Sequence, residues 1–399
     1  MAHHAPSSEA ELTELVRETA TALAIQGGSS LEGIGRPIAA DDVLSLERLA
    51  GITLYRPTEL VFQAKAGTPV AEAETALAAE GQALPFEPPD LRHLLGTEDR
   101  TPTLGGLVAT NLSGPARVAR GALRDSLIGV RFVDGTGLIM RSGGRVMKNV
   151  TGLDIVKLSA GAHGTLGVLT EVTFKVLPQA QTETTLVIEG QDATQAARTL
   201  QAAMATPLEV AAAAWLPAEL AEASSLGRNA PLTLLRLQTF TDFLDRRTTA
   251  LQRLVQARGS TTRLDPDTSR TLWRDVRDVR LLAEPRERAI WRLSVAPSHG
   301  PTLHTTLTRE LDATGFLDWS GGLLWLAVPL GDDAGAATLR HHLRQTGGHA
   351  TCIRAPAALR ARIDVFEPRA KPLMAMTERL KDTFDPKRRL NPGRMYAGI

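Results

Sequence analysis

The clearest alternation of apolar and polar positions lies in residues 168–176. Every second residue from Val168 to Val176 would face one side of an extended chain, whereas Glu171 and Lys175 would face the other. A period of two residues is typical of a β-strand with one buried face. The pattern therefore predicts a strand over these residues.

Three glycines, Gly161, Gly164 and Gly167, precede this strand at intervals of three residues. Glycine allows close backbone approach and positive φ, and a run of free N–H groups suits a phosphate or a flat ring. Nicotinamide enzymes instead carry G-x-G-x-x-G between a strand and a helix. The order G-x-x-G-x-x-G before a strand therefore disfavours a nicotinamide enzyme.

A second glycine turn is predicted near the N-terminus. Ser8 and Glu11 have capping-box spacing, and apolar residues recur on one helical face over 12–23. This helix leads into residues 24–26, a short strand candidate, and then into residues 27–30, which read Gly-Gly-Ser-Ser. A strand that enters such a turn suits a phosphate cradle, although an ordinary Gly-Ser turn is the simpler interpretation of these four residues alone.

The next elements are a strand, a helix and a loop. Residues 60–66 predict the strand. Thr68 has the features of a helix N-cap with Pro69 in the first helical position, and the helix would end at Gly81. Residues 84–102 are rich in proline and charge, which predicts a long loop.

This loop is followed by Leu104, Gly105 and Gly106. The two glycines predict a turn whose backbone passes close to a bound ring. Residues 127–133 and 138–141 flank an Asp-Gly pair and predict a hairpin.

The character of the chain changes after Pro178, where glycine loops become rarer and alanine, leucine and arginine increase. We predict a domain boundary at 178–182. Beyond it, strands are predicted over 184–189, 209–215, 232–238, 290–296, 323–328 and 349–354, and helices over 192–204, 241–257, 302–313 and 333–346. The repeated order predicts two split βαβ units that build one antiparallel sheet with helices on one face, and hence an α+β fold.

Composition narrows the class of protein. The 399 residues allow two or three domains at about 150 residues each. Basic and acidic residues number 45 and 44, which argues against a nucleic-acid-binding protein and provides no polybasic membrane tether. Cys352 is the single cysteine, so an internal disulfide or a cysteine metal cage cannot form. Because no apolar run approaches the roughly 18 residues of a membrane span and no signal peptide is evident, we expect a cytoplasmic protein.

Short motifs occur in a fixed order along nearly the whole chain. They are residues 57–61, 66–69, 84–89, 112–115, 121–125, 144–150, 161–177, 290–294, 318–322, 347–351 and 391–396. Together they resemble the FAD-binding fold shared by vanillyl-alcohol oxidase and the p-cresol methylhydroxylase flavoproteins, and more narrowly the FAD-binding subunits of bacterial glycolate oxidases. The final motif, Asn-Pro-Gly-Arg-Met-Tyr, is the most specific match.

The resemblance implies a two-lobed FAD-binding domain of the p-cresol methylhydroxylase type over residues 1–180. A smaller antiparallel-sheet cap would span 181–365, and a C-terminal helix and tail, 366–399, would return to the flavin. The residues implied in cofactor binding are Gly27, Gly28, Ser29, Ser30, Leu104, Gly105, Gly106, Gly161, Gly164, Leu166, Gly167, Val168 and Asn391. Noncovalent FAD is expected, with attachment through Cys352 or His163 as the alternative.

The chemistry that the resemblance implies is oxidation of a small 2-hydroxy acid such as glycolate, with hydride transfer to flavin and proton removal by a base. Arg292 is the candidate for binding the substrate carboxylate, because a guanidinium fork matches that group. His349 is the candidate base. The simpler interpretations are an ion-paired arginine on a half-exposed strand and a surface histidine.

No compact His-rich motif with an acidic companion is present in the sequence, so we expect no metal. This pattern fits an FAD-binding subunit whose partners are a second flavin-containing catalytic subunit and an iron–sulfur subunit, through which it would lie peripheral to a membrane. The alternatives are a free-standing 2-hydroxy-acid dehydrogenase and a noncatalytic flavin-binding assembly subunit. The basic residues between 371 and 389 predict a solvated face, with docking to an acidic partner as the alternative.

Overall fold

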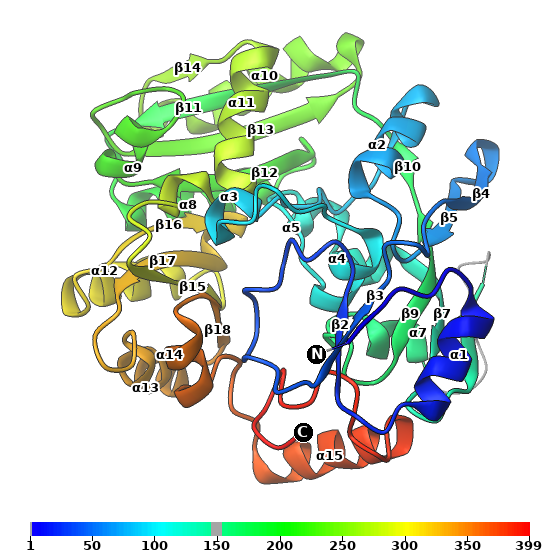
Figure 1. Cartoon of the computed structure of the whole chain (residues 1–399). Helices are drawn as coiled ribbons and strands as arrows, with labels where there is room; N and C mark the ends of the chain where they lie inside the picture. Colours follow the sequence, from blue (N-terminus) through cyan, green and yellow to red (C-terminus); the bar gives the residue numbers. More distant parts are fainter. Residues whose placement is uncertain (1, 145–153) are drawn as a thin grey trace.

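The computed structural model describes residues 2–144 and 154–399, and most of the motif at 144–150 lies outside them. Two lobes lie side by side in Figure 1. We call the part that carries β1–β10 the N-terminal lobe and the part that carries β11–β18 the sheet lobe. The predicted domain boundary near residue 180 stays a prediction.

A small parallel sheet opens the N-terminal lobe. Its strand order is β1 (His3–His4), β3 (Asp42–Ser45), β2 (Leu23–Gln26), and α1 (Glu9–Glu18) packs beside it through Leu12 and Val16. The hydroxyl of Ser8 accepts a hydrogen bond from the Glu11 amide at 3.2 Å, which confirms the predicted cap. The Glu11 carboxylate bonds to the Ser7 amide, so the capping box is only half formed.

A five-stranded antiparallel sheet forms the main core of this lobe. Its order is β4 (Ile52–Arg56), β5 (Val61–Lys65), β9 (Val168–Lys175), β7 (Leu127–Val133), β8 (Ile139–Gly143). The predicted strands and the hairpin are confirmed. β9 is the central strand of this sheet, and most of its side chains on both faces are buried, including those of Thr170 and Thr173. The prediction of a single buried face is therefore corrected, since of this strand Glu171 and Lys175 alone are partly exposed.

Two local predictions in this lobe are wrong. Helix α2 (Val70–Ala79) begins one residue later than predicted, with Pro69 at the N-cap. Thr68 does not cap it, because its buried hydroxyl accepts a hydrogen bond from the Gly51 amide instead. Gly105 and Gly106 do not form a turn; they lie in the first turn of α4 (Leu104–Thr110), which Thr103 caps.

The remaining elements of the N-terminal lobe are short. They are η1 (Pro57–Glu59), β6 (Gln82–Ala83), α3 (Arg92–Leu95), α5 (Arg117–Arg120), α6 (Leu123–Ser126), α7 (Ile155–Ser159) and β10 (Leu177–Pro178), which pairs with β6. The predicted loop at 84–102 therefore contains one helical turn, α3.

The sheet lobe is built on one eight-stranded antiparallel sheet. Its strands are β14 (Thr261–Arg263), β11 (Thr182–Glu189), β13 (Leu232–Thr239), β12 (Val210–Leu216), β16 (Thr314–Asp318), β17 (Leu323–Pro329), β15 (Arg288–Ser294) and β18 (His349–Arg354), in that order. Each half is a βαββαβ unit with the same internal strand order, and the two halves meet where β12 pairs with β16. The predicted repeat is confirmed, although the short polar β14 and the glycine-containing β16 were missed.

Helices cover both faces of this sheet, which corrects the prediction of helices on one face. One core cluster packs α8 (Ala193–Met204), α10 (Thr241–Val255), α12 (Gly300–Glu310) and α13 (Ala336–Thr346) against one face. The opposite face packs against α11 (Pro266–Arg277) through Leu272 and Trp273, and against Leu91 and Leu94 of the N-terminal lobe. The short elements α9 (Ala218–Ala223), η2 (Gln256–Arg258), η3 (Arg280–Leu282), η4 (Trp319–Gly321) and α14 (Ala357–Arg362) complete the lobe.

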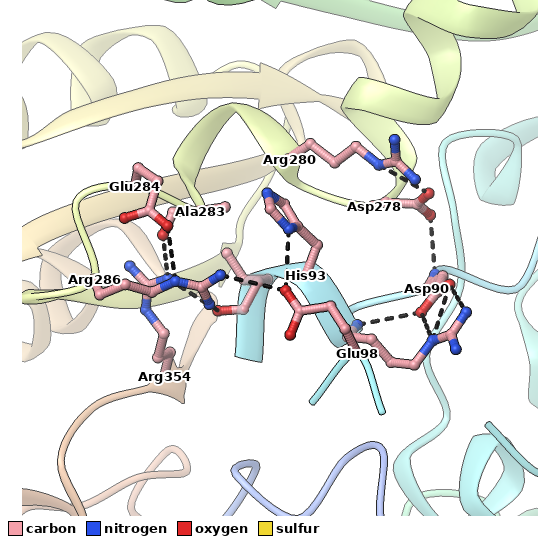
Figure 2. Close-up of polar contacts among 11 residues, drawn as sticks. Asp90, His93, Glu98, Asp278, Arg280, Ala283, Glu284, Arg286 and Arg354 are labelled. Carbon is pink, nitrogen blue, oxygen red and sulfur yellow. Dashed lines mark hydrogen bonds and ion pairs between the residues drawn. The ribbon is translucent and has the colours of Figure 1, made fainter. Parts of the chain in front are cut away.

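The charged loop around α3 joins the two lobes, as Figure 2 shows. The buried Asp278 carboxylate accepts a hydrogen bond from the Asp90 amide at 2.9 Å. Arg354 donates to the Leu94 carbonyl at 2.9 Å and to the Ala283 carbonyl at 2.6 Å. This loop therefore attaches the N-terminal lobe to the edge of the sheet.

A buried ion-pair network makes a second connection between the lobes. Arg236 of β13 donates to Glu87 of the N-terminal lobe at 2.6 Å and to Glu183 of β11 at 2.8 Å. Glu183 also accepts from Ser269 and Gln238 at 2.8 Å. Both carboxylates are therefore satisfied by partners that the fold brings from separate elements.

The C-terminal tail returns to the N-terminal lobe. After α15 (Lys371–Phe384), Leu390 runs parallel to Leu23, whose carbonyl accepts a hydrogen bond from the Asn391 amide at 3.0 Å. No helix among the described residues is long and apolar enough to cross a membrane.

Candidate functional site

A cavity of about 420 Å³ lies mainly against the N-terminal lobe, and α14 of the sheet lobe and the C-terminal tail complete its lining. A volume of a few hundred Å³ is usual for a cofactor or substrate site. Nine of the residues predicted to bind the cofactor line it: Gly27, Gly28, Ser29, Ser30, Gly105, Gly106, Gly164, Gly167 and Asn391. The turn at 27–30, the start of helix α4, the glycine loop and the C-terminal tail, which are far apart in the sequence, are thus brought together around one space.

Four other predicted residues do not line the cavity. Leu104 and Val168 are fully buried in the core behind it. Gly161 and Leu166 belong to the neighbouring loop, and the Gly161 amide donates to the Val108 carbonyl at 2.9 Å. These residues position the lining segments, because they anchor the glycine loop to α4 and to β9.

The turn over residues 27–30 presents free backbone donors. The amides of Gly27, Gly28 and Ser29 donate no hydrogen bond to any other residue that the structure describes. Ser29 has φ 58°, so the turn adopts a left-handed conformation at this position. Successive amides in such a turn form a concave site for an anion. The turn is therefore suited to a phosphate group.

Gly28 is required here for packing as well. A Cβ atom at this position would overlap the carbonyl oxygen of Thr101, which belongs to the strand-like segment beside the turn. We predict that Gly28→Ala weakens FAD binding about 5- to 100-fold, because overpacking of about 1–3 kcal/mol must displace the turn. Titration of the apoprotein with FAD would measure this.

Gly33→Ala is the matched control for that variant. Its Cβ would meet Leu95 at 3.4 Å, an ordinary van der Waals distance, and we expect FAD affinity to stay unchanged. Equal affinities of both alanine variants would contradict the assignment of the turn.

Asn391 joins two of the cavity walls. Its side-chain oxygen accepts from the Ile25 amide at 2.8 Å, and its side-chain nitrogen donates to the His163 carbonyl at 2.7 Å. Gly164 is close to the same amide group, with no room for a Cβ. The C-terminal motif therefore fixes the distance between β2 and the glycine loop.

His163 lines the cavity, and its ring lies 4.9 Å from that of Phe366. Burial, together with the positive charge of Arg394, lowers the pKa of His163 from 6.5 to about 3. A histidine in this environment is neutral at physiological pH and does not act as an acid.

This burial makes folding sensitive to acid. In the unfolded chain the histidine gains a proton below about pH 6.5, whereas the folded form stays neutral down to about pH 3. Stability is therefore lost as the pH falls, by about 2 kcal/mol between about pH 7.5 and about pH 5. Urea titrations at the two pH values measure the free energy of unfolding. We predict that between these pH values His163→Gln loses about 2 kcal/mol less of this free energy than the unaltered protein does. An equal loss in both proteins would contradict a neutral buried His163.

Three charged residues that line the cavity were missed in the sequence. Arg360 and Arg394 are cationic, and Glu32 is acidic. Arg394 donates to the carbonyls of Arg36 and Glu32, and burial near Arg360 lowers the pKa of Arg394 to about 10. Arg394 belongs to the C-terminal motif at 391–396, so the sequence held a signal that could have placed Arg394 at the cavity. No sequence motif pointed to Arg360.

The two candidate catalytic residues, Arg292 and His349, do not line this cavity. They lie on β15 and β18, where Arg292 is opposite Thr351 and Ser294 is opposite His349. These four side chains share the face of the sheet that turns toward the N-terminal lobe. The guanidinium group of Arg292 lies over the ring of Trp319, 4.9 Å from its centre, and the residue is half-buried on its strand.

Cys352 is fully buried in the core on the opposite face of β18 and does not line the cavity. The position of Cys352 therefore does not suit a covalent bond to a ligand in the cavity. Within residues 2–144 and 154–399, no three His, Cys, Asp or Glu side chains gather in a way that would hold a metal ion.

Comparisons with known proteins define the class. Residues 2–143 match the family model described as an FAD binding domain. A 4-ethylphenol oxidase from Gulosibacter chungangensis superposes with a TM-score of 0.72 at 13% identity, over 99% of this chain and 89% of that one, which shows the shared fold. The protein is thus an FAD-linked oxidoreductase with the predicted α+β fold and the predicted cofactor.

The particular family follows from two relatives. Glycolate oxidase subunit GlcE of Escherichia coli K12 is 34% identical over 379 residues, 95% of this chain and 94% of that protein. Glycolate oxidase subunit GlcD of Bacillus subtilis is 35% identical over 115 residues, 29% of this chain and 23% of that protein. The chain belongs to the GlcE family of glycolate oxidase subunits.

Proposed function

We propose that this chain is the FAD-binding subunit of a glycolate oxidase complex and takes part in the oxidation of glycolate to glyoxylate. The observation that carries the proposal is the 34% identity to GlcE along 95% of the chain. The convergence of two glycine loops and the glycine-containing start of α4 on one cavity supports the same function.

In this proposal the FAD diphosphate lies against the turn at 27–30. The unbonded amides of Gly27, Gly28 and Ser29 support this placement. Arg360 and Arg394 add two positive charges to the cavity wall, which favours a doubly charged diphosphate over a neutral ligand. His163 is neutral and adds no charge to the cavity wall.

FAD, when bound, supplies the acceptor for the hydride that leaves the substrate. The protein must then bind the substrate carboxylate and remove the hydroxyl proton. We propose Arg292 for the carboxylate, since it is a half-buried guanidinium group on the face of the sheet lobe that turns toward the FAD-binding lobe. We propose His349 for the proton. Its side chain is exposed at the start of β18, and partial desolvation together with the nearby Arg292 lowers its pKa, so the imidazole is neutral at pH 7.

The electrons would leave through an iron–sulfur subunit, and a second flavin-containing subunit would complete the complex. This chain has one cysteine, too few to hold an iron–sulfur cluster by itself. The partial similarity to GlcD supports a relative of the same fold as the second flavin subunit. We further propose a cytoplasmic location, with any membrane association made through the partners.

The experiment is to purify the chain alone and with its two partner subunits, and to record visible absorbance before and after anaerobic addition of glycolate. We expect the isolated chain to bind FAD and the complex to bleach. Bleaching of the isolated chain would instead indicate a free-standing dehydrogenase. A chain that binds no FAD would contradict the proposal.

A further inference from the structure

Two arginines from different lobes converge on one aromatic ring. The guanidinium carbon of Arg117, from α5 of the N-terminal lobe, lies 4.4 Å from the centre of the Trp319 ring. That of Arg292, from β15 of the sheet lobe, lies 4.9 Å from it. The Trp319 side chain is buried and donates to the Gly114 carbonyl at 3.1 Å, so the ring is fixed between the lobes.

These two positive charges are not neutralised locally. In the part of the chain that the structure describes, neither Arg117 nor Arg292 forms an ion pair or a side-chain hydrogen bond. Burial and the neighbouring Arg117 lower the pKa of Arg292 to about 10. Both residues are half-buried, and positive charges that are partly removed from water without a counter-charge are destabilising, which favours an anion as their partner.

The charged groups around the pair do not supply that anion. Asp318 is buried and accepts from the Trp319 amide at 2.7 Å, and burial raises the pKa of Asp318 to about 7. Asp125 lies near Arg117 without forming an ion pair with it, and accepts a hydrogen bond from the Ala122 amide at 2.9 Å. Near His349, the carboxylate of Glu367 is paired with Arg340. Among the described residues, the negative charges around the two arginines are therefore distant or already paired.

The backbone at this point is strained. Trp319 has φ 50° and Ser320 has φ 60°, both in the left-handed region that non-glycine residues avoid. Such backbone conformations are unfavourable for residues other than glycine, and they cluster at ligand and active sites. The strained turn holds the ring on which both arginines lie, and this observation is independent of their charge.

A series of contacts links the cavity wall to β18. His163 lines the cavity and contacts Phe366, and the next residue, Glu367, accepts from the Ala350 amide at 2.9 Å. Ala350 neighbours His349 on β18. The cavity wall and the proposed base are thus connected by consecutive contacts.

We propose that Arg117 and Arg292, one from each lobe, together bind the carboxylate of a single small organic anion beside Trp319. The identity of that anion as the 2-hydroxy acid rests on the proposed function. Because the ligand is shared between lobes, Arg117 acts as a second binding residue for the substrate and not as a surface charge.

The test is calorimetric titration of the full FAD-loaded chain with glycolate and with glycolamide, which has a similar size and no charge. We expect glycolamide to bind at least about 10-fold more weakly than glycolate. Arg117→Gln and Arg292→Gln should each weaken glycolate binding by about 10- to 100-fold, since each removes a charge-assisted contact.

Arg253→Gln is the matched control, because Arg253 is an exposed arginine on α10, which packs on the opposite face of the sheet, and its glycolate affinity should not change. Visible flavin absorbance of each variant reports FAD content separately, so failure of the proposed FAD site is distinguishable from failure of the anion site. If Arg117→Gln does not fold, Arg117→Lys is measured in its place. We expect this variant to bind glycolate with an affinity between those of the unaltered protein and an uncharged variant, because lysine keeps the positive charge but lacks the two-pronged guanidinium group. Unchanged glycolate affinity in the Arg117 and Arg292 variants, equal binding of glycolamide, or no binding of glycolate to the unaltered chain would overturn the proposal.

Discussion

Replacement of Arg236 by methionine should lower the free energy of unfolding by about 3–5 kcal/mol, since it leaves two buried carboxylates without their shared cation. Glu87 and Glu183 are held by this guanidinium group at 2.6 and 2.8 Å. The positive charge of Arg236 also holds the pKa of Glu87 below its usual value in spite of burial. Without it, Glu87 and Glu183 would repel each other inside the interface between the lobes.

Urea denaturation followed by tryptophan fluorescence measures this effect, because all five tryptophans lie in the sheet lobe. Arg56→Met is the control. Arg56 pairs with Glu59 at the same distance of 2.8 Å, but both side chains are nearly half exposed. An exposed ion pair contributes about 0–1 kcal/mol to stability. A similar decrease in the free energy of unfolding in both variants would therefore contradict a larger contribution from the buried network.

Replacement of Lys381 by methionine should also lower the free energy of unfolding by about 3–5 kcal/mol. The same replacement should weaken FAD binding. The fully buried ammonium group donates to Asp385 at 2.8 Å, to the Thr165 carbonyl at 2.8 Å and to the Leu390 carbonyl at 2.7 Å. It therefore ties helix α15 and the C-terminal tail to the glycine loop of the cavity. Its loss leaves Asp385 buried and releases the tail that carries Asn391.

Two comparisons make this prediction specific. Lys371→Met alters an exposed lysine on the same helix and should stay within about 0.5 kcal/mol of the unaltered protein. The double variant Lys381→Met, Asp385→Asn removes the buried charge as well and should be more stable than Lys381→Met alone. FAD titration of the same proteins measures the effect on the cavity. Equal stability of the two lysine variants would refute the role given to Lys381.

Local sequence patterns were sufficient for most of the individual elements. The period-two pattern at 168–176 became β9, and the repeated strand and helix order after Pro178 became the eight-stranded sheet. The errors arose where a tertiary contact overrode a local preference. Thr68 is taken by the Gly51 amide and does not cap α2, and α11 covers the face of the sheet that was expected to be bare.

The sequence by itself determined the glycine turns, the family and the cofactor, because backbone conformation and close approach depend on which residues occupy a few neighbouring positions. Tertiary structure alone decided which of those residues reach the cavity. Leu104 and Val168 point into the core, whereas Arg360 and Arg394 arrive at the cavity from the distant end of the chain. It also decided that Arg117 and Arg292 meet at Trp319. Contacts between residues about two hundred positions apart follow from how lobes pack together, and local periodicity carries no information about that packing.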